Sequence, residues 1–240
     1  MDDKLVLKKR AAEEAVGYVE SGMVVGLGTG STAGCAIELI AECIKSGVLR
    51  DVLCIPSSIR TENLAKSLGI PLTTLDDHPE IDITIDGADE VDPELNMIKG
   101  GGGALLREKV LQQQSRRTVI IVDESKLSPV LGSGFALPVE VVPFAMGAEA
   151  RHIESLGARV TVRKGGDGTL YKTDQGNVIL DCAFGEIADA SGLASRLERR
   201  AGVVEHGLFL GLADEVLVAV GGGEEDERGG GAVRHLRPNG

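Results

Sequence analysis

Short apolar runs alternate with amphipathic stretches along the first half of this 240-residue chain, and this alternation constrains the fold more than any other feature. Apolar runs predict buried strands, and helical periodicity predicts helices, at residues 5–20 (helix), 23–25 (strand), 31–46 (helix), 52–55 (strand), 61–68 (helix), 81–85 (strand), 104–114 (helix) and 118–122 (strand). Strands joined through helices run parallel, because the chain must cross back before the next strand begins. The pattern predicts an α/β fold with a Rossmann-like, doubly wound, mostly parallel sheet.

The order of predicted elements changes after residue 126. Strands at 139–142, 159–162, 178–182 and 203–210 and helices at 147–156 and 187–199 follow the order β-α-β-β-α-β, which predicts a smaller ferredoxin-like α+β domain. A strand at 215–220 would return to the first sheet. We therefore expect a Rossmann-like domain of residues 1–131 plus 211–222 and a smaller domain of residues 132–210. The charged, glycine-rich tail at 223–240 has little to bury and is expected to be disordered.

One segment, residues 81–109, carries several chemically active side chains. Its strand ends at an Asp-Gly turn, so Asp86 and Asp89, followed by Glu90 and Asp92, lie at a carboxyl end of the sheet, where ligands bind in such folds. Lys99 and a glycine run come next, and Glu108 lies on the following helix. Together they offer a carboxylate to move a proton, a cation to stabilise an oxyanion and a second acid to contact substrate hydroxyls.

Two other interpretations of the acidic residues stay open. First, the acidic residues could form a solvated surface turn. Second, they could bind Mg²⁺ or Ca²⁺, as oxygen-rich clusters do. The spacing lacks the alternating ligands of an EF-hand, and a lysine lies nearby. We therefore expect no metal at this segment.

A second glycine-rich loop, residues 26–33, lies between a predicted strand and a predicted helix. Glycine allows the backbone to approach a ligand closely, and the free amides at a helix N-terminus favour an anion. Ser31 and Thr32 add hydroxyl donors there, although ordinary helix capping would use the same residues. The loop predicts a site for a small phosphate. Lys126, which follows a third strand, is either a further cation at the same edge or a solvated charge.

The same loop also fits the G-x-G-x-x-A pattern of a dinucleotide site, through Gly28, Gly30 and Ala33. The next strand ends without an acid to hold a ribose hydroxyl, although Arg60 offers a cation for an additional phosphate. An NADP-dependent oxidoreductase is therefore an alternative. A P-loop is excluded, because no glycine-lysine pair precedes Ser31 or Thr32.

Composition narrows the choice of partners and compartment. The chain has 25 basic and 37 acidic residues and a net charge of −12, which argues against a nonspecific nucleic-acid surface. Its four cysteines lack C-x-x-C spacing, which favours buried thiols in a reducing compartment. The N-terminal residues do not resemble a signal peptide, and no apolar run is long enough to span a membrane. We expect a cytoplasmic protein without membrane or nucleic-acid partners.

Four motifs in order, GTGSTA at 28–33, DGADE at 86–90, KGGGGALLREK at 99–109 and DESK at 123–126, closely resemble type A ribose-5-phosphate isomerase. The resemblance runs from about residue 5 to residue 220. It implies interconversion of ribose 5-phosphate and ribulose 5-phosphate in the pentose phosphate pathway, with no metal or organic cofactor. A non-catalytic sugar-phosphate sensor is a second alternative, but no basic segment or helix-turn-helix pattern favours it.

The resemblance also implies roles for individual residues. Glu108 would be the base that shuttles a proton between carbons 2 and 1 through an ene-diolate, and Lys99 would stabilise the oxyanion. Asp86 would assist ring opening, and Asp89 would hydrogen-bond the sugar. The residues expected to bind substrate and phosphate are Gly28, Thr29, Gly30, Ser31, Thr32, Gly100, Gly101, Gly102 and Lys126. The family resemblance further implies a homodimer or homotetramer.

Overall fold

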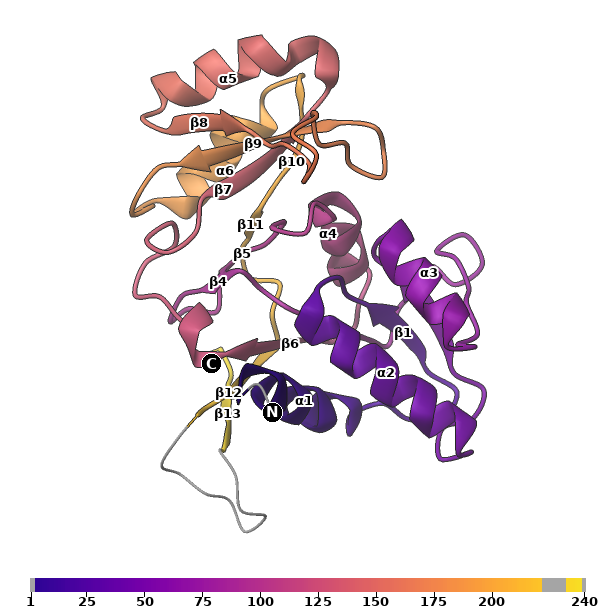
Figure 1. Cartoon of the computed structure of the whole chain (residues 1–240). Coiled ribbons are helices and arrows are strands. Elements are labelled where there is room, and N and C mark those ends of the chain that lie inside the picture. The colour runs from indigo at the N-terminus through magenta and orange to yellow at the C-terminus, as the bar shows by residue number, and fades with distance from the viewer. Residues whose placement is uncertain (1–2, 222–231, 239–240) are drawn as a thin grey trace. The chain divides into compact units, whose positions relative to one another are not determined.

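The computed structural model describes residues 3–221 and 232–238, which divide into two compact units (Figure 1). The first unit comprises the described residues up to Ala88, Arg107–Lys126 and those from Gly211 onward. The second comprises Asp89–Leu106 and Leu127–Leu210. Among the described helices, none is long and apolar enough to cross a membrane.

A six-stranded sheet forms the centre of the first unit. Its strands lie in the order β13-β12-β6-β3-β1-β2, and their bounds are Val24–Leu27 (β1), Leu53–Pro56 (β2), Ile83–Asp86 (β3), Thr118–Asp123 (β6), Glu215–Ala219 (β12) and Val233–Leu236 (β13). Every neighbouring pair is parallel except β12 with β13. The predicted mostly parallel, doubly wound sheet is confirmed. Because β1 lies between β2 and β3, the winding direction reverses at β1, and the gap between β1 and β3 is the topological switch point.

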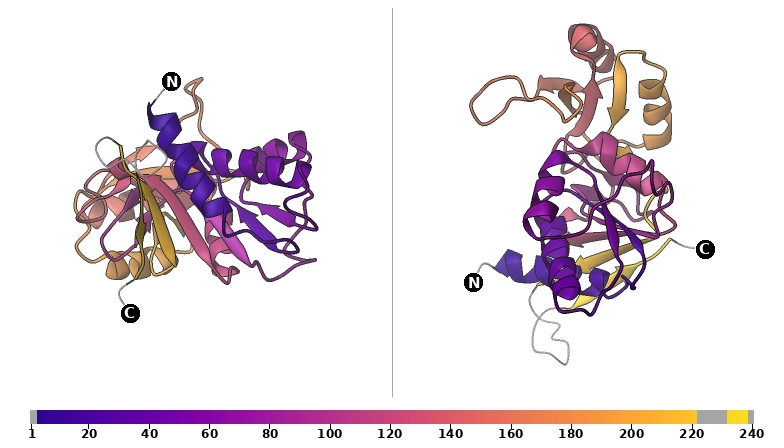
Figure 2. Two further views of the ribbon diagram at one scale, coloured as in Figure 1. Left: turned by 90° about the horizontal axis from the view of Figure 1, so that it is seen from below. Right: turned by 90° about the vertical axis from the view of Figure 1, so that its right-hand side faces the viewer.

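Helices cover the sheet of the first unit. They are α1 (Asp3–Val16), α2 (Ser31–Lys45), α3 (Ile59–Ser67) and α4 (Leu105–Gln113). Helix α1 packs against α2, β6 and β12 through the fully buried Ala11, Ala12 and Ala15, whose small side chains allow close approach (Figure 2). Leu111 of α4 instead packs with Ile55 and Ile81 in a separate apolar cluster.

The second unit contains a four-stranded antiparallel sheet and two helices. The sheet order β10-β7-β9-β8, with the chain order β7-α5-β8-β9-α6-β10, is that of a ferredoxin-like fold, so this prediction is also confirmed. The bounds are Leu137–Val141 (β7), Met146–Ser155 (α5), Arg159–Val162 (β8), Val178–Ala183 (β9), Ala190–Glu198 (α6) and Val203–His206 (β10). Alternate residues of β7 and β9, such as Val139 and Leu180, pack against Ile153 of α5 and Leu197 of α6.

A small three-stranded sheet completes the second unit and changes the expected division of the chain. Strands β4 (Glu90–Val91), β5 (Met97–Ile98) and β11 (Leu208–Phe209) pair antiparallel in the order β11-β5-β4. Residues 89–106 belong to the second unit through this pairing, and residues 127–131 belong to it too. The sequence-based division placed both segments in the first domain. Strands of two residues are too short to show a periodic pattern, and the partner β11 lies far along the chain.

The prediction of a disordered tail is wrong for residues 233–236, which form β13 against β12. Val233 packs on the apolar core of the first unit, and His235 and Arg237 both hydrogen-bond the buried Glu215. The high glycine and charge content of the tail favoured a prediction of disorder, so this short strand was not predicted. Residues 232, 237 and 238 of the tail are also described, whereas residues 223–231 and 239–240, and residue 222 before the tail, lie outside the described residues.

Candidate active site

Asp86 and the loop after β1 meet at the switch point of the first unit. Asp86 ends β3 and is completely buried. Its Oδ1 accepts hydrogen bonds from the backbone N–H groups of Thr29 (3.1 Å) and Gly87 (2.7 Å). The Gly28 N–H also donates to the carbonyl of Ile85 (3.0 Å), which ties the loop to β3. Backbone groups therefore fix the orientation of the Asp86 carboxylate.

The hydroxyl of Thr29 points into a network of buried hydroxyls rather than standing alone. Thr29 donates to Ser58 (2.8 Å), Ser58 donates to Thr61 (3.0 Å), and Thr61 donates to the carbonyl of Gly28 (3.0 Å). Ser57 lies 2.7 Å from the same Thr29 hydroxyl. Ser58 also caps α3 by accepting from the Thr61 N–H. The network ties the glycine loop to residues 57–61, whose hydroxyl groups therefore have a structural role in fixing the loop.

The N-terminus of α2 carries a cation that the sequence did not single out. Nζ of Lys8, on α1, donates to Oγ of Ser31, the first residue of α2 (2.9 Å). Gly30 precedes the helix with a φ of 126°, a conformation that favours glycine. The first turn of α2 contains no acidic residue. An anion at this end would meet helix amides, the Ser31 hydroxyl and the Lys8 ammonium together.

Two further predicted residues belong to the first unit. Glu108 lies on α4 and is only 4% exposed. Lys126 ends the short 3₁₀ helix η1 (Glu124–Lys126), which directly follows β6. Because β1, β3 and β6 are parallel neighbours, their carboxyl ends share one edge of the sheet. Asp86 is the last residue of β3, and Gly28 and Lys126 come just after β1 and β6.

The second unit positions Lys99, Asp89 and the glycine run. Lys99 is 2% exposed, its backbone N–H donates to Gly207 (2.9 Å), and its Nζ lies 5.5 Å from the centre of the Phe209 ring. The Asp89 N–H donates to Ile98 (2.9 Å), and Oδ2 of Asp89 accepts from the Gly101 N–H (2.7 Å). The pairing of β4 with β5 therefore sets Asp89 opposite the glycine run.

The other two acids of the segment are engaged in local structure. The Glu90 carboxylate accepts from the N–H groups of Gly132 (2.7 Å) and Gly134 (2.9 Å) and so holds that loop. Asp92 accepts from the backbone of Glu94 (2.9 Å) and Asn96 (2.8 Å), which closes a turn. These hydrogen bonds give Glu90 and Asp92 a structural role that requires no ligand.

Comparison with known proteins identifies the family. The family described as ribose 5-phosphate isomerase A (phosphoriboisomerase A) matches residues 53–223. The chain belongs to this family. Ribose-5-phosphate isomerase A of Desulfatibacillum aliphaticivorans is 60% identical over 219 residues, which cover 91% of this chain and 95% of that protein.

Solved structures agree with this membership. Ribose 5-phosphate isomerase from Plasmodium falciparum is 42% identical with a TM-score of 0.90, covering 97% of this chain and 98% of that one. A D-ribose-5-phosphate isomerase in complex with phospho-erythronic acid is 37% identical, with the same TM-score of 0.90 and the same coverage. This chain is an isomerase that interconverts ribose 5-phosphate and ribulose 5-phosphate, as the four motifs implied. Membership favours this activity over the oxidoreductase and the sensor.

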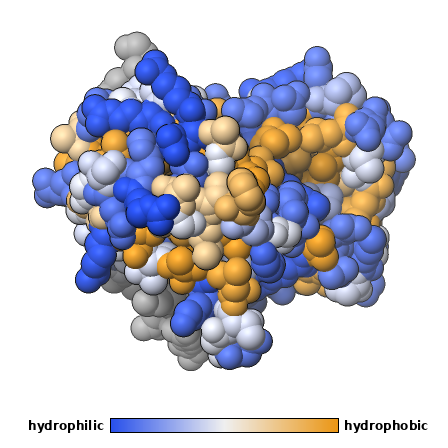
Figure 3. Space-filling view, turned by 90° about the horizontal axis from the view of Figure 1, so that it is seen from above, coloured by the Kyte–Doolittle hydropathy of each residue, from blue (hydrophilic) through white to orange (hydrophobic). Residues whose placement is uncertain are grey.

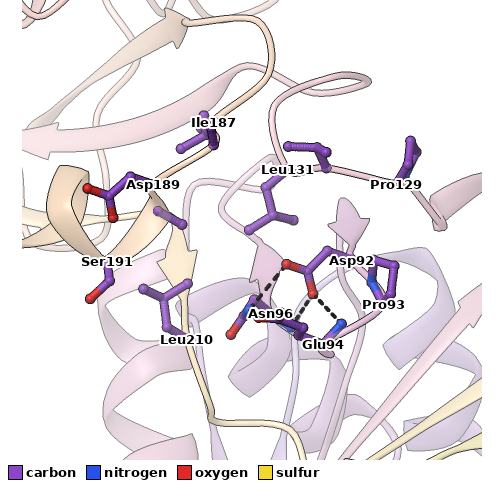
Figure 4. A pocket seen from close by; sticks show the side chains of 13 residues that line it. Asp92, Pro93, Glu94, Asn96, Pro129, Leu131, Ile187, Asp189, Ser191 and Leu210 are labelled. Atoms are coloured by element: carbon purple, nitrogen blue, oxygen red, sulfur yellow. Dashed lines mark hydrogen bonds between the residues drawn. The ribbon is translucent and has the colours of Figure 1, made fainter.

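The isomerase also has an open cavity that holds none of the predicted site residues (Figure 4). It lies within the second unit and has a volume of about 570 Å³. Asp92, with its hydrogen-bonded turn, forms one wall, and Asp189 and Ser191 at the start of α6 form another. The cavity is therefore separate from the residues to which the family resemblance assigns chemistry.

Proposed function

We propose that this isomerase works through an ene-diolate and that Glu108 is its base. Glu108 would take the proton from carbon 2 of the open-chain aldose and return it to carbon 1. Meanwhile a proton would pass from the hydroxyl on carbon 2 to the oxygen on carbon 1, which completes the ketose. The burial of Glu108 supports this role, because a base shielded from water keeps the proton it has taken and protects the reactive intermediate.

Lys99 would stabilise the oxyanion that develops during proton transfer. A buried ammonium acts strongly on such a charge because little water screens it, and Lys99 is buried beside the Phe209 ring. Asp89 would hydrogen-bond the sugar while it holds Gly101, and Gly100, Gly101 and Gly102 would line the sugar with backbone groups. The order of these residues in the KGGGG motif supports the assignment.

Asp86 would open the sugar ring by exchanging a proton with the ring oxygen and the anomeric hydroxyl. Two backbone N–H groups already point at its Oδ1, so the carboxylate needs no rearrangement before it acts. Preorganisation of this kind lowers the cost of reaching the transition state.

The substrate phosphate would bind at the N-terminus of α2. Gly28, Thr29, Gly30, Ser31, Thr32 and Lys126 were expected to bind substrate and phosphate. The N–H groups of Gly28 and Thr29 already donate to Ile85 and Asp86, so the phosphate would instead meet the hydroxyls of Ser31 and Thr32. The Lys8–Ser31 contact adds a cation there. The phospho-erythronic acid bound by the 37% identical structure supports the proposal, since it carries a phosphate and a carboxylate that resembles the ene-diolate.

We also propose a metal-independent, cytoplasmic enzyme that acts as a homodimer or homotetramer without nucleic-acid or membrane partners. The bacterial source of the 60% identical relative supports a cytoplasmic location.

The surface of the protein supports self-association. Apolar patches interrupt the hydrophilic surface in Figure 3, and Phe144 of the 3₁₀ helix η2 (Pro143–Ala145) is fully exposed. Such patches favour self-association. Light scattering on the purified protein would measure the oligomeric state.

The deciding experiment is isomerisation of ribose 5-phosphate in EDTA-treated buffer by the wild type, Glu108→Gln and the exposed control Glu38→Gln. We expect metal-independent turnover in the wild type and the control, and a loss of about 10²–10⁴-fold in Glu108→Gln. An inactive wild type would reject the proposed reaction. Turnover that survives in Glu108→Gln would retain the reaction but assign the base elsewhere.

A further inference from the structure

The glycine run that follows Lys99 does not define its own conformation. Glycine has the widest choice of backbone angles, so a stretch of four loses much entropy when it is fixed. Here Gly100 and Gly103 have positive φ angles of 104° and 78°, and the Gly103 N–H donates to the Gly100 carbonyl (2.9 Å). Other residues must select this conformation among the many available.

Arg163, just after β8, contacts the run directly. Its Nη1 donates to the carbonyls of Gly100 (2.7 Å) and Gly101 (3.1 Å). The Gly100 carbonyl and the Gly101 N–H belong to one peptide group, and this N–H donates to Asp89. The peptide joining Gly100 and Gly101 is therefore held at both ends, by Arg163 and by a residue to which the proposed mechanism assigns sugar contact.

Asp181 of β9 fixes the guanidinium that makes these contacts. Nε of Arg163 donates to Oδ2 of Asp181 (2.9 Å), and Nη2 donates to Oδ1. This two-point pairing sets the plane of the guanidinium, and the Arg163 side chain is only 13% exposed. A lysine carries all its N–H donors on one nitrogen, so it could not pair with both Asp181 oxygens and also reach the glycine carbonyls in the same way.

Tyr171 extends the contact by one residue. Its hydroxyl donates to the Gly102 carbonyl (3.2 Å), and its backbone N–H donates to Arg163 (3.1 Å). Three successive carbonyls, those of Gly100, Gly101 and Gly102, thus accept hydrogen bonds from two side chains of one hairpin.

We propose that Arg163, oriented by Asp181 and assisted by Tyr171, is a positioning residue for the isomerase reaction. It would hold the glycine run, and with it the backbone of Lys99, in the conformation that the transition state requires. This inference rests on the proposed roles of Lys99 and the glycine run. Arg163 touches no reacting atom in this scheme and acts only through the loop.

The test compares kcat and KM of Arg163→Ala, Arg163→Lys and Tyr171→Phe with those of Arg200→Ala. Arg200 is a matched control, because it makes a similar two-point pair with Glu149 in the same unit (2.8 and 3.2 Å). We expect kcat of Arg163→Ala to fall by roughly 10–100-fold, since a small misplacement of catalytic groups is enough for such a loss. Arg163→Lys should recover part of it, and Tyr171→Phe should lose less.

A second measurement separates positioning from general damage to the fold. Added methylguanidine should restore part of the activity of Arg163→Ala, whereas it should leave Arg200→Ala unchanged. Equal kcat values for Arg163→Ala and Arg200→Ala would overturn the inference while leaving the isomerase function intact. If Arg163→Ala does not fold, Arg163→Lys and Tyr171→Phe decide, and wild-type kcat in both would overturn it. An inactive wild type would instead reject the proposed function itself.

Discussion

Gly28, directly after β1, lies against Asp86 at the end of β3: a Cβ on Gly28 would be 2.1 Å from Oδ1 of Asp86 and 2.6 Å from its Cα. Only hydrogen fits there, so glycine is required at position 28 for its small size. The same contact lets the Thr29 N–H reach the carboxylate.

Gly28→Ala should therefore displace Asp86 or the phosphate loop. We expect kcat/KM for ribose 5-phosphate to fall by about 100-fold, in line with the cost of small misplacements in active sites. Gly34→Ala in α2 is the control, because its Cβ would meet nothing within 4 Å, and it should be active and slightly more stable. Equal loss of activity in both variants would show that Gly28 is not specifically required.

Lys8→Met should weaken binding of the substrate phosphate. We expect KM for ribose 5-phosphate and the inhibition constant of inorganic phosphate to rise together by about 10-fold, since a charged hydrogen bond contributes about 1.5–3 kcal/mol. Lys9→Met, on an exposed position of the same helix, is the control. Unchanged phosphate inhibition in Lys8→Met would remove Lys8 from the anion site.

Glu140 should make the stability of the protein depend on pH. Burial raises the pKa of Glu140 above its usual value, and hydrogen bonds from Asn177 and Thr173 only partly oppose this. The contribution of Glu140 to the free energy of unfolding should therefore fall as pH rises from about 4.5, the ordinary pKa, through the raised pKa of the folded state. Glu140→Gln removes the charge, so its stability relative to the wild type should increase with pH.

Urea unfolding at pH 4.5 and pH 8 measures this effect, with the exposed Glu154→Gln as the control. A stability difference between the wild type and Glu140→Gln that does not change between the two pH values would contradict the prediction.

Glu215 should have the opposite pH dependence. Burial alone would raise its pKa, but hydrogen bonds from His235, Arg117 and Arg237 together lower it. Its stabilising contribution is then present above the ordinary value of 4.5 and lost as pH falls through the lowered pKa. At pH 7, Glu215→Gln should cost about 2 kcal/mol, because charged hydrogen bonds to a buried carboxylate are lost.

Thermal unfolding at several pH values would follow the loss, with Glu42→Gln on the surface of α2 as the control. A stability gap between the wild type and Glu215→Gln that does not narrow in acid would mean that the ion pairs of Glu215 contribute little.

Local patterns were enough to predict the two folds and the position of Asp86. Strand–helix alternation fixes which strands are parallel, and residues just after parallel strands share one edge, so Gly28, Asp86 and Lys126 could be placed from sequence. These predictions needed only periodicity and the position of each residue relative to a strand end.

Features that depend on distant partners could not be predicted in this way. Lys8 looks like its neighbour Lys9 until the fold brings it to Ser31. From sequence, Glu90 resembles an active-site acid, but in the fold its carboxylate accepts hydrogen bonds from the N–H groups of Gly132 and Gly134. The pairing of Arg163 with the glycine run likewise joins segments that share no local signal.

Strand β12 lies between β6 and β13 in the sheet, but the chain reaches it only after Leu210, the last residue of the second unit. On a ribosome, β6 is therefore made long before its neighbour, and its edge stays open while the whole second unit is translated. Open strand edges invite pairing with other chains, so truncated or stalled products that end before Glu215 should aggregate. The unit that starts first during synthesis is the one that must finish last.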